Sequence, residues 1–269
     1  MRFVFVYVTI HHGSKIRSRR IYKWPMEKIL KALIVAFFAL LIVGTHALAD
    51  PAVVDPGDSL VAYWPADGDF NDVVGGNNGT PHGGVCFVPG DIGLAFDFDG
   101  KTGRVAIPDS PSLALTQSLA ITAWIDINAY PTAAAFILFR GDDRPGLDPY
   151  KFFVNPEGTL GLSISDAGNN EAHVVSPSPL PVGVWTYVSA SLDNSTGVMS
   201  VYINGILAAT STTTVRPFGP LDPAQSPGLG IGNVQSGNYT DYFDGIIDEV
   251  KLYDSAQPAA VPPFVDSPR

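Results

Sequence analysis

Apolar and polar residues alternate along most of the chain between Asp58 and Ser255. Side chains of a strand point alternately to its two faces, so a period of two predicts strands with one buried face. Gly, Pro, Asn and Asp interrupt the alternation about every eight to twelve residues, which is the spacing of turns in all-β domains. No sustained helical period or internal repeat is present. The pattern predicts an antiparallel β-sandwich.

The clearest strands are predicted at 118–127 and 184–193, where apolar or small residues occupy every second position. Two shorter apolar segments, 198–203 and 206–209, flank the pair Asn204-Gly205. Asn and Gly tolerate the positive φ angles of a type I′ turn, so these segments are predicted to form a tight hairpin.

The segment 244–253 is predicted to be the closing strand. Its alternation places Ile246, Asp248, Val250 and Leu252 on one face, so a carboxylate shares a face with three large apolar side chains. A buried carboxylate without a partner costs several kcal/mol. Asp248 therefore predicts a bound cation at this strand. The rival interpretation is a carboxylate that backbone N–H groups or a nearby Lys or Arg satisfy.

The first 49 residues lack the strand pattern. Ala32 to Val43 is an unbroken apolar run, preceded by Lys28 and Lys31 and followed by Ala47-Leu48-Ala49. This order is typical of a secretory signal peptide cleaved after Ala49. The alternative, a membrane anchor, is disfavoured because a spanning helix needs roughly 20 apolar residues. Ser18-Arg19-Arg20 lies too far upstream for a twin-arginine signal.

These features predict the organisation of the chain. We expect a helical signal peptide at 1–49, a linker at 50–57, one β-sandwich domain at 58–255 and a disordered Pro- and Ala-rich tail at 256–269. Met26 alone opens a conventional leader, so translation is expected to start there. The protein is expected to be secreted, periplasmic or at the cell surface, with no membrane span once the leader is removed.

Removal of the leader makes the chain strongly acidic. Residues 1–49 hold eight of the 16 Lys and Arg but one of the 26 Asp and Glu, so 8 basic and 25 acidic residues remain, a net charge of about −17. Such a surface repels nucleic acid and anionic membranes. All but three of the remaining acids are Asp, which suits turns and the coordination of hard cations.

Several segments in the range 58–255 together resemble the laminin-G-like, concanavalin A-like jelly-roll domains of exported bacterial proteins. They are Leu60–Gly68, Asn71-Asp72, Asn77–Thr80, Ala95–Gly100, Val105–Leu113, Leu119–Trp124, Trp185–Val188, Val201–Gly205 and Phe243–Val250. The resemblance implies a two-sheet jelly roll of about twelve to fourteen strands, commonly with a structural calcium ion. Family members bind glycans or proteins, and fold membership alone does not decide between them.

The resemblance also implies that calcium joins the last strand to the N-terminal part of the domain. Asp248 is then the natural side-chain ligand, and Asp67 and Asp99, each followed by glycine, are candidate partners. Ca²⁺ takes six to eight oxygens from carboxylates and backbone carbonyls. The simpler interpretation of Asp67 and Asp99 is turn stabilisation.

Signals for catalysis are weak. Related glycosidases carry paired carboxylates on one strand as Glu-x-Asp-x-x-Glu, and this chain has no such motif. Outside the leader, His82 and His173 are too few and too far apart in sequence for a zinc site. Cys86 is the single cysteine, which excludes an intramolecular disulfide and is interpreted as a packing residue.

The loop 238–242 is the best sequence candidate for ligand binding. Tyr239, Asp241 and Tyr242 place two aromatic rings among polar groups, as carbohydrate sites do. We therefore predict an exported, calcium-stabilised, non-catalytic module that binds a glycan or polysaccharide. The alternatives are a structural domain that binds an extracellular protein and, less favoured, a divergent glycoside hydrolase.

Overall fold

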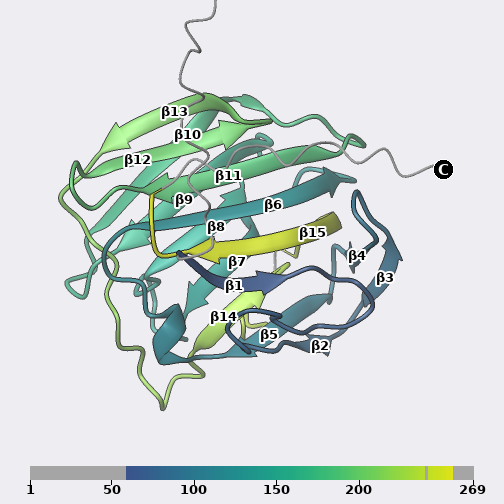
Figure 1. The fold of residues 1–269 in the computed structure, drawn as a ribbon, viewed down its shortest axis with the longest axis horizontal. Coiled ribbons are helices and arrows are strands. Elements are labelled where there is room, and N and C mark those ends of the chain that lie inside the picture. Colours follow the sequence, from purple (N-terminus) through teal and green to yellow (C-terminus); the bar gives the residue numbers. More distant parts are fainter. Residues whose placement is uncertain (1–58, 240–241, 257–269) are drawn as a thin grey trace, which may run out of the picture. The chain divides into compact units, whose positions relative to one another are not determined.

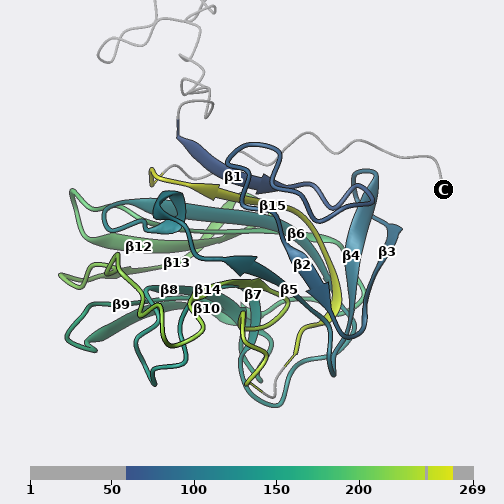
Figure 2. The same ribbon diagram turned by 90° about the horizontal axis from the view of Figure 1, so that it is seen from below.

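The computed structural model describes residues 59–239 and 242–256, which form fifteen strands in two antiparallel sheets (Figures 1 and 2). The predicted sandwich is confirmed. The expected signal peptide, linker and most of the expected tail lie outside the described residues, as does Asp241. Within the described ranges, no helix is long and apolar enough to cross a membrane.

The first sheet has eight strands in the order β13-β12-β11-β6-β15-β4-β3, with β1 paired to β15. Its strands are β1 (Leu60–Trp64), β3 (Val85–Pro89), β4 (Leu94–Asp99), β6 (Leu119–Ile127), β11 (Thr186–Leu192), β12 (Val198–Ile203), β13 (Ile206–Thr212) and β15 (Asp244–Tyr253).

The second sheet has seven strands in the order β10-β9-β8-β7-β14-β5-β2. Its strands are β2 (Thr80–His82), β5 (Arg104–Pro108), β7 (Ala135–Gly141), β8 (Tyr150–Val154), β9 (Thr159–Ser165), β10 (Glu171–Pro179) and β14 (Gly228–Ile231). A short 3-10 helix, η2 (Pro111–Leu113), follows β5. Figure 2 shows β6 and β15 in one layer and β8, β9 and β14 in the other.

The core lies between the two sheets. In β6, Leu119, Ile121 and Ile125 have no exposed surface, as the alternation predicts. Leu229 and Ile231 of β14 enter the same core from the second sheet. Each such side chain contributes about 1.5–3 kcal/mol through removal of apolar surface from water. The core therefore holds the outer faces of both sheets rigid.

The hairpin between β12 and β13 forms as predicted. Asn204 and Gly205 have φ angles of 50° and 74°, and Ile203 faces Ile206 across the turn. Both φ values lie in the left-handed region that a type I′ turn requires.

The expected alternation of β15 is wrong because the strand contains a β-bulge. Glu249 has a φ angle of 55°, and the pairing with β6 shifts register between Asp248 and Lys251. As a result Ile247, Val250 and Leu252 face the core. Asp248 pairs with Trp124 and lies on the opposite face of the sheet. A bulge adds one residue to a strand and reverses the faces that follow it.

The bulge lies where two strands meet the same edge of β15. β4 pairs with the half that begins at Asp244, and β1 pairs with the half that ends at Tyr253. Asp248 therefore lies at the junction of β1, β4 and β15, beside the turn that joins β3 to β4.

Candidate functional site

Asp248 is fully buried at this junction. Its Oδ2 accepts a hydrogen bond from the backbone N–H of Ile92 at 3.1 Å. Its Oδ1 has no hydrogen-bond partner within the described part of the chain. Burial raises the pKa of Asp248 to about 7, and the nearby negative charges of Glu249 and Asp67 act in the same direction. A carboxylate in this position needs a positive partner to remain ionised.

Asp67, which follows β1, contacts the same β3–β4 turn as Asp248. Its Oδ1 accepts a hydrogen bond from the backbone N–H of Leu94 at 2.9 Å. A Cβ added at Gly93 would lie 2.0 Å from that oxygen, and one at Gly90 would lie 2.5 Å from Oδ2 of Asp248. The two glycines therefore allow the turn to approach both carboxylates closely.

Asp99 does not join Asp67 and Asp248. It ends β4, whereas the contact of Asp67 is with Leu94 at the start of β4, about 16 Å away at 3.3 Å per residue. Its Oδ1 accepts backbone N–H groups of Lys101, Thr102 and Gly103. Burial opposes ionisation, but these hydrogen bonds outweigh it and lower the pKa of Asp99 to about 2. Asp99 thus stabilises its own turn.

Metal-ligating side chains are sparse around Asp248. The described ranges contain no group of three or more His, Cys, Asp or Glu arranged to hold a metal ion. An ion at this junction would bind Oδ1 of Asp248 and would take its other ligands from Asp67, backbone carbonyls and water. Calcium accepts such a mixed oxygen set.

The predicted aromatic loop lies on the outer face of the seven-stranded sheet. Tyr239 is 39% exposed and packs against Phe136 with 5.3 Å between ring centroids. Its carbonyl accepts a hydrogen bond from Nδ2 of Asn233, and the Tyr242 hydroxyl donates one to the Gly237 carbonyl. Of the two described tyrosines, Tyr239 exposes a ring, whereas Tyr242 is half-buried and holds the loop together.

A small aromatic cluster supports Tyr239. Phe136, Phe139, Phe153 and Val234 form a buried group separate from the main core. Phe136 pairs with Phe153, and Phe139 with Lys151, on the side of the sheet opposite to Leu138 and Phe152 of the core. The sheet therefore has apolar side chains on both faces here, and Tyr239 covers the outer group.

Polar side chains continue this outer face across β8, β9 and β10. Lys151, Ser163 and His173 are consecutive cross-strand neighbours. The Lys151 ammonium lies 2.9 Å from Glu171 and 3.5 Å from Asp148, and the Ser163 hydroxyl donates to Glu171. Burial raises the pKa of Asp148 to about 6, although Lys151 opposes the shift. Hydrogen-bonding groups thus lie directly beside the aromatic cluster.

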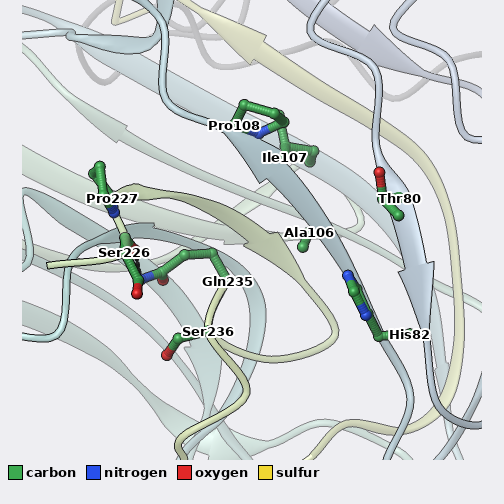
Figure 3. A pocket seen from close by; sticks show the side chains of 9 residues that line it. All are labelled: Thr80, His82, Ala106, Ile107, Pro108, Ser226, Pro227, Gln235 and Ser236. Atoms are coloured by element: carbon green, nitrogen blue, oxygen red, sulfur yellow. Dashed lines mark hydrogen bonds between the residues drawn. The ribbon is translucent and has the colours of Figure 1, made fainter. Parts of the chain in front are cut away.

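A shallow pocket of about 280 Å³ opens at the other side of this face. Figure 3 shows Ala106 of β5 between His82 of β2 and Gln235 of the loop that follows β14. Ser226, Ser236 and the other lining residues add hydroxyl groups and proline rings, and none of them is Asp, Glu, Lys or Arg. The pocket lining therefore combines apolar and hydrogen-bonding groups without a formal charge.

Comparison with known families decides the classification. A laminin-G-type family model, described as the concanavalin A-like lectin/glucanases superfamily, matches residues 99–260.

The chain belongs to this superfamily.

Solved structures show the same superfamily fold. Domain 4 of AbnA, an extracellular arabinanase from Geobacillus stearothermophilus solved with arabinotriose, is 22% identical with a TM-score of 0.58, over 76% of this chain and 96% of that one. The CBM40 of a Ruminococcus gnavus sialidase, bound to sialyllactose, is 15% identical with a TM-score of 0.51, over 61% and 90%. No curated protein sequence matches this chain significantly.

A further match is the binding domain of botulinum neurotoxin serotype D, which is 14% identical with a TM-score of 0.55. The match covers 74% of this chain and 49% of that domain. At these identities the similarity establishes the fold that this member of the superfamily adopts, and not its ligand.

Two parts of the outer face have no counterpart among the residues predicted from the sequence. Lys151, Asp148 and Glu171 meet only because β8 and β10 both flank β9. His82, Ala106, Ser226 and Gln235 come from four separate segments of the chain. The sequence does contain one indication of the first part. Apolar and polar residues alternate along β8, β9 and β10 so that Lys151, Ser163 and His173 lie on the face opposite to the core.

Proposed function

We propose that the protein is an exported, non-catalytic module that binds glycans through the outer face of its seven-stranded sheet. The observation that carries this proposal is the exposed ring of Tyr239, which is braced by Phe136 and lies beside a row of polar side chains. Sugar rings stack their C–H faces on aromatic rings, and their hydroxyls need well-placed donors and acceptors. A rigid sheet positions both kinds of group.

The comparisons support this function by fold likeness. The AbnA domain and the CBM40 were solved with arabinotriose and sialyllactose, respectively. A type C botulinum neurotoxin structure with the same fold is described as interacting with two ganglioside molecules. The AbnA enzyme is extracellular, which agrees with the leader predicted at 1–49.

Structural calcium at Asp248 is part of the proposal. The buried carboxyl offers Oδ1 without a partner, and Asp67 brings a second carboxylate to the same turn. Bound calcium would supply positive charge to this buried group and would tie β15 to the turn between β3 and β4. Removal of calcium is then expected to loosen this junction without a direct change at Tyr239, which lies on the other sheet.

The binding test compares two tyrosines. Replacing Tyr239 by Ala is expected to weaken oligosaccharide binding about two- to twelvefold, because aromatic packing is worth about 0.5–1.5 kcal/mol. Tyr202→Ala is the matched control, because Tyr202 lies on β12 of the other sheet. Equal binding by both variants would exclude Tyr239 from the site. Release of reducing ends from any bound polysaccharide would contradict the non-catalytic role.

One observation favours protein binding as a second function. Ile206 and Leu207, at the tip of the β12–β13 hairpin, are 74% and 52% exposed. Exposed neighbouring apolar side chains are common at protein interfaces. A folded protein that binds no glycan in a broad panel would shift the proposal to this surface.

A further inference from the structure

The pocket of Figure 3 has features of a binding site that neither the sequence nor the comparisons assign. Its floor is Ala106, at the centre of β5, with the side chain directed away from the core. Thr80 pairs with Ala106 from β2, and His82 follows two residues later on the same face. Because β2 is the last strand of the sheet, the pocket is open at the sheet edge.

The loop after β14 forms the opposite wall by folding back over its own strand. A Cβ at Gly230 would lie 2.1 Å from the Asn233 carbonyl oxygen, and one at Gly228 would lie 3.2 Å from Cγ of Gln235. A side chain at Gly230 would therefore clash with the loop backbone, whereas one at Gly228 would clash with the Ile107 carbonyl of β5, 2.6 Å away, and would only press on Gln235. The glycines of β14 therefore allow the loop to fold back over the strand, and the amide of Gln235 is directed toward Ser226 (Figure 3).

Gln235 is held in place with one hydrogen-bonding atom unused. Its Nε2 donates to the Ser226 carbonyl at 2.6 Å, and Nε of Arg104 donates to the Gln235 carbonyl at 3.3 Å. Gln235 is only 8% exposed, and within the described part of the chain its Oε1 has no hydrogen-bond partner. A buried amide oxygen without a donor costs about 1–3 kcal/mol, which a bound hydroxyl would recover.

Ser226 adds a second sign of a built site. It is a non-glycine residue with a φ angle of 48°, in the left-handed region that side chains disfavour. Such strained positions concentrate at binding sites. Here the strain directs the Ser226 carbonyl to Gln235 and leaves the hydroxyl at the pocket wall.

The chemistry of the lining selects the ligand class. Hydroxyls of Thr80, Ser226 and Ser236 can each donate and accept. Burial and the charge of Arg104 lower the pKa of His82, so its imidazole is neutral at pH 7 and offers one donor and one acceptor. Paired donors and acceptors without formal charge suit a polyol, and the acidic surface elsewhere disfavours anionic ligands.

The size of the pocket limits what it can enclose. At about 280 Å³ it falls just below the roughly 300–1,000 Å³ of pockets that hold drug-sized ligands. One sugar ring fits this volume, and the rest of an oligosaccharide can extend out of the pocket at the open sheet edge.

We propose that the pocket between β2 and the loop after β14 binds one ring of an uncharged sugar, as a subsite of the glycan-binding face. This inference rests on the proposed function. In it, Gln235 Oε1 accepts a sugar hydroxyl, His82 bonds a second, and Ala106 leaves the space for the ring. Arg104 is a positioning residue, because it holds the loop through the Gln235 carbonyl.

The test is NMR of the whole protein with a set of trisaccharides, in which both the ligand signals and the histidine side-chain signals are observed. The uncharged probes are arabinotriose, xylotriose, cellotriose and mannotriose, and the anionic probes are trigalacturonic acid and sialyllactose. At least one uncharged probe is expected to bind and to shift the imidazole signals of His82. Ala106→Phe, which fills the pocket, is expected to weaken that binding about tenfold, and His82→Ala about threefold or more.

Thr210→Phe is the matched control for the added ring, because Thr210 is exposed on β13 of the other sheet. If Ala106→Phe does not fold, the exposed edge-strand variants His82→Ala and Thr80→Val decide the result. Binding that persists in all pocket variants but falls in Tyr239→Ala would overturn this subsite and leave the proposed function standing. Equal binding of the anionic probes would overturn the ligand class. Failure of every probe with folded protein would overturn both proposals.

Discussion

Replacing Asp248 by Asn tests the buried charge at the junction of β1, β4 and β15. Asn has the same shape as Asp but cannot ionise. Burial raises the pKa of Asp248 from 3.8 to about 7. A pKa that is higher by one in the folded than in the unfolded protein corresponds to about 1.4 kcal/mol, so at pH 8 the ionised carboxylate destabilises the calcium-free protein by about 4 kcal/mol. This cost is absent below pH 4 and grows as the pH rises to 7.

The assay is urea unfolding at pH 8, in EDTA and again in calcium chloride. In EDTA the Asn variant is expected to be more stable than the natural protein by several kcal/mol. In calcium the natural protein is expected to gain about 2.7 kcal/mol when calcium is at 100 times its Kd, whereas the Asn variant gains nothing. Asp143→Asn serves as the control, because Asp143 is exposed.

Three results would contradict this interpretation of Asp248. If the Asn variant is less stable than the natural protein in EDTA at pH 8, the carboxylate is not an uncompensated buried charge. If both proteins gain equally from calcium, Asp248 is not a ligand. Unchanged stability of the natural protein between EDTA and calcium would remove the ion from the account altogether.

Three further predictions concern stability. Burial raises the pKa of Asp148 to about 6. Because the folded protein then resists ionisation of this carboxyl, the free energy of unfolding is expected to fall by about 3 kcal/mol between pH 4 and pH 7. The Asp148→Asn variant should not show this pH-dependent fall in urea titrations. Asp72 accepts hydrogen bonds from four backbone N–H groups. The Asp72→Ala variant is therefore expected to lower the free energy of unfolding by about 3 kcal/mol or more. An unchanged thermal midpoint would show that these hydrogen bonds do not stabilise the fold. Gly205→Val places a branched side chain at a φ angle of 74° and is expected to cost about 2 kcal/mol, whereas a neutral result in thermal melts would exclude the type I′ turn.

Local chemistry explains what the sequence predicted well. Asn204-Gly205 specifies its own turn type, and the apolar positions of Leu119 to Ile127 identify their buried face without knowledge of the partner strand. The boundaries of the closing strand, Asp244 and Tyr253, were also correct.

The phase of the closing strand could not be predicted, because the bulge at Glu249 depends on tertiary pairing. β4 and β1 reach β15 from the same edge, and the extra residue lies between them. Asp248 was correctly expected to be buried, but it is buried beneath the turn at Ile92 and not among the core side chains. Alternation alone carries no information about such a junction.

The composition of the outer face was still harder to anticipate. The pocket combines edge-strand, sheet-centre and loop residues that are about 150 positions apart in the chain, and only the strand order β14-β5-β2 brings them together. Tyr239 was found because aromatic residues among polar ones in a loop form a local pattern. Asp99 was grouped with Asp248 because a glycine follows it and such a turn can leave carbonyls free for a cation, whereas the structure places Asp99 at the far end of β4.

Glycan binding is the central claim, and a polysaccharide and oligosaccharide binding screen of the folded protein, in calcium and in EDTA, tests it most directly. Binding of at least one uncharged glycan is expected, weakened by Tyr239→Ala and unaffected by Tyr202→Ala, and thermal stability is expected to be lower in EDTA than in calcium. If protein shown to be folded binds no glycan in the panel, the claim of glycan binding is contradicted.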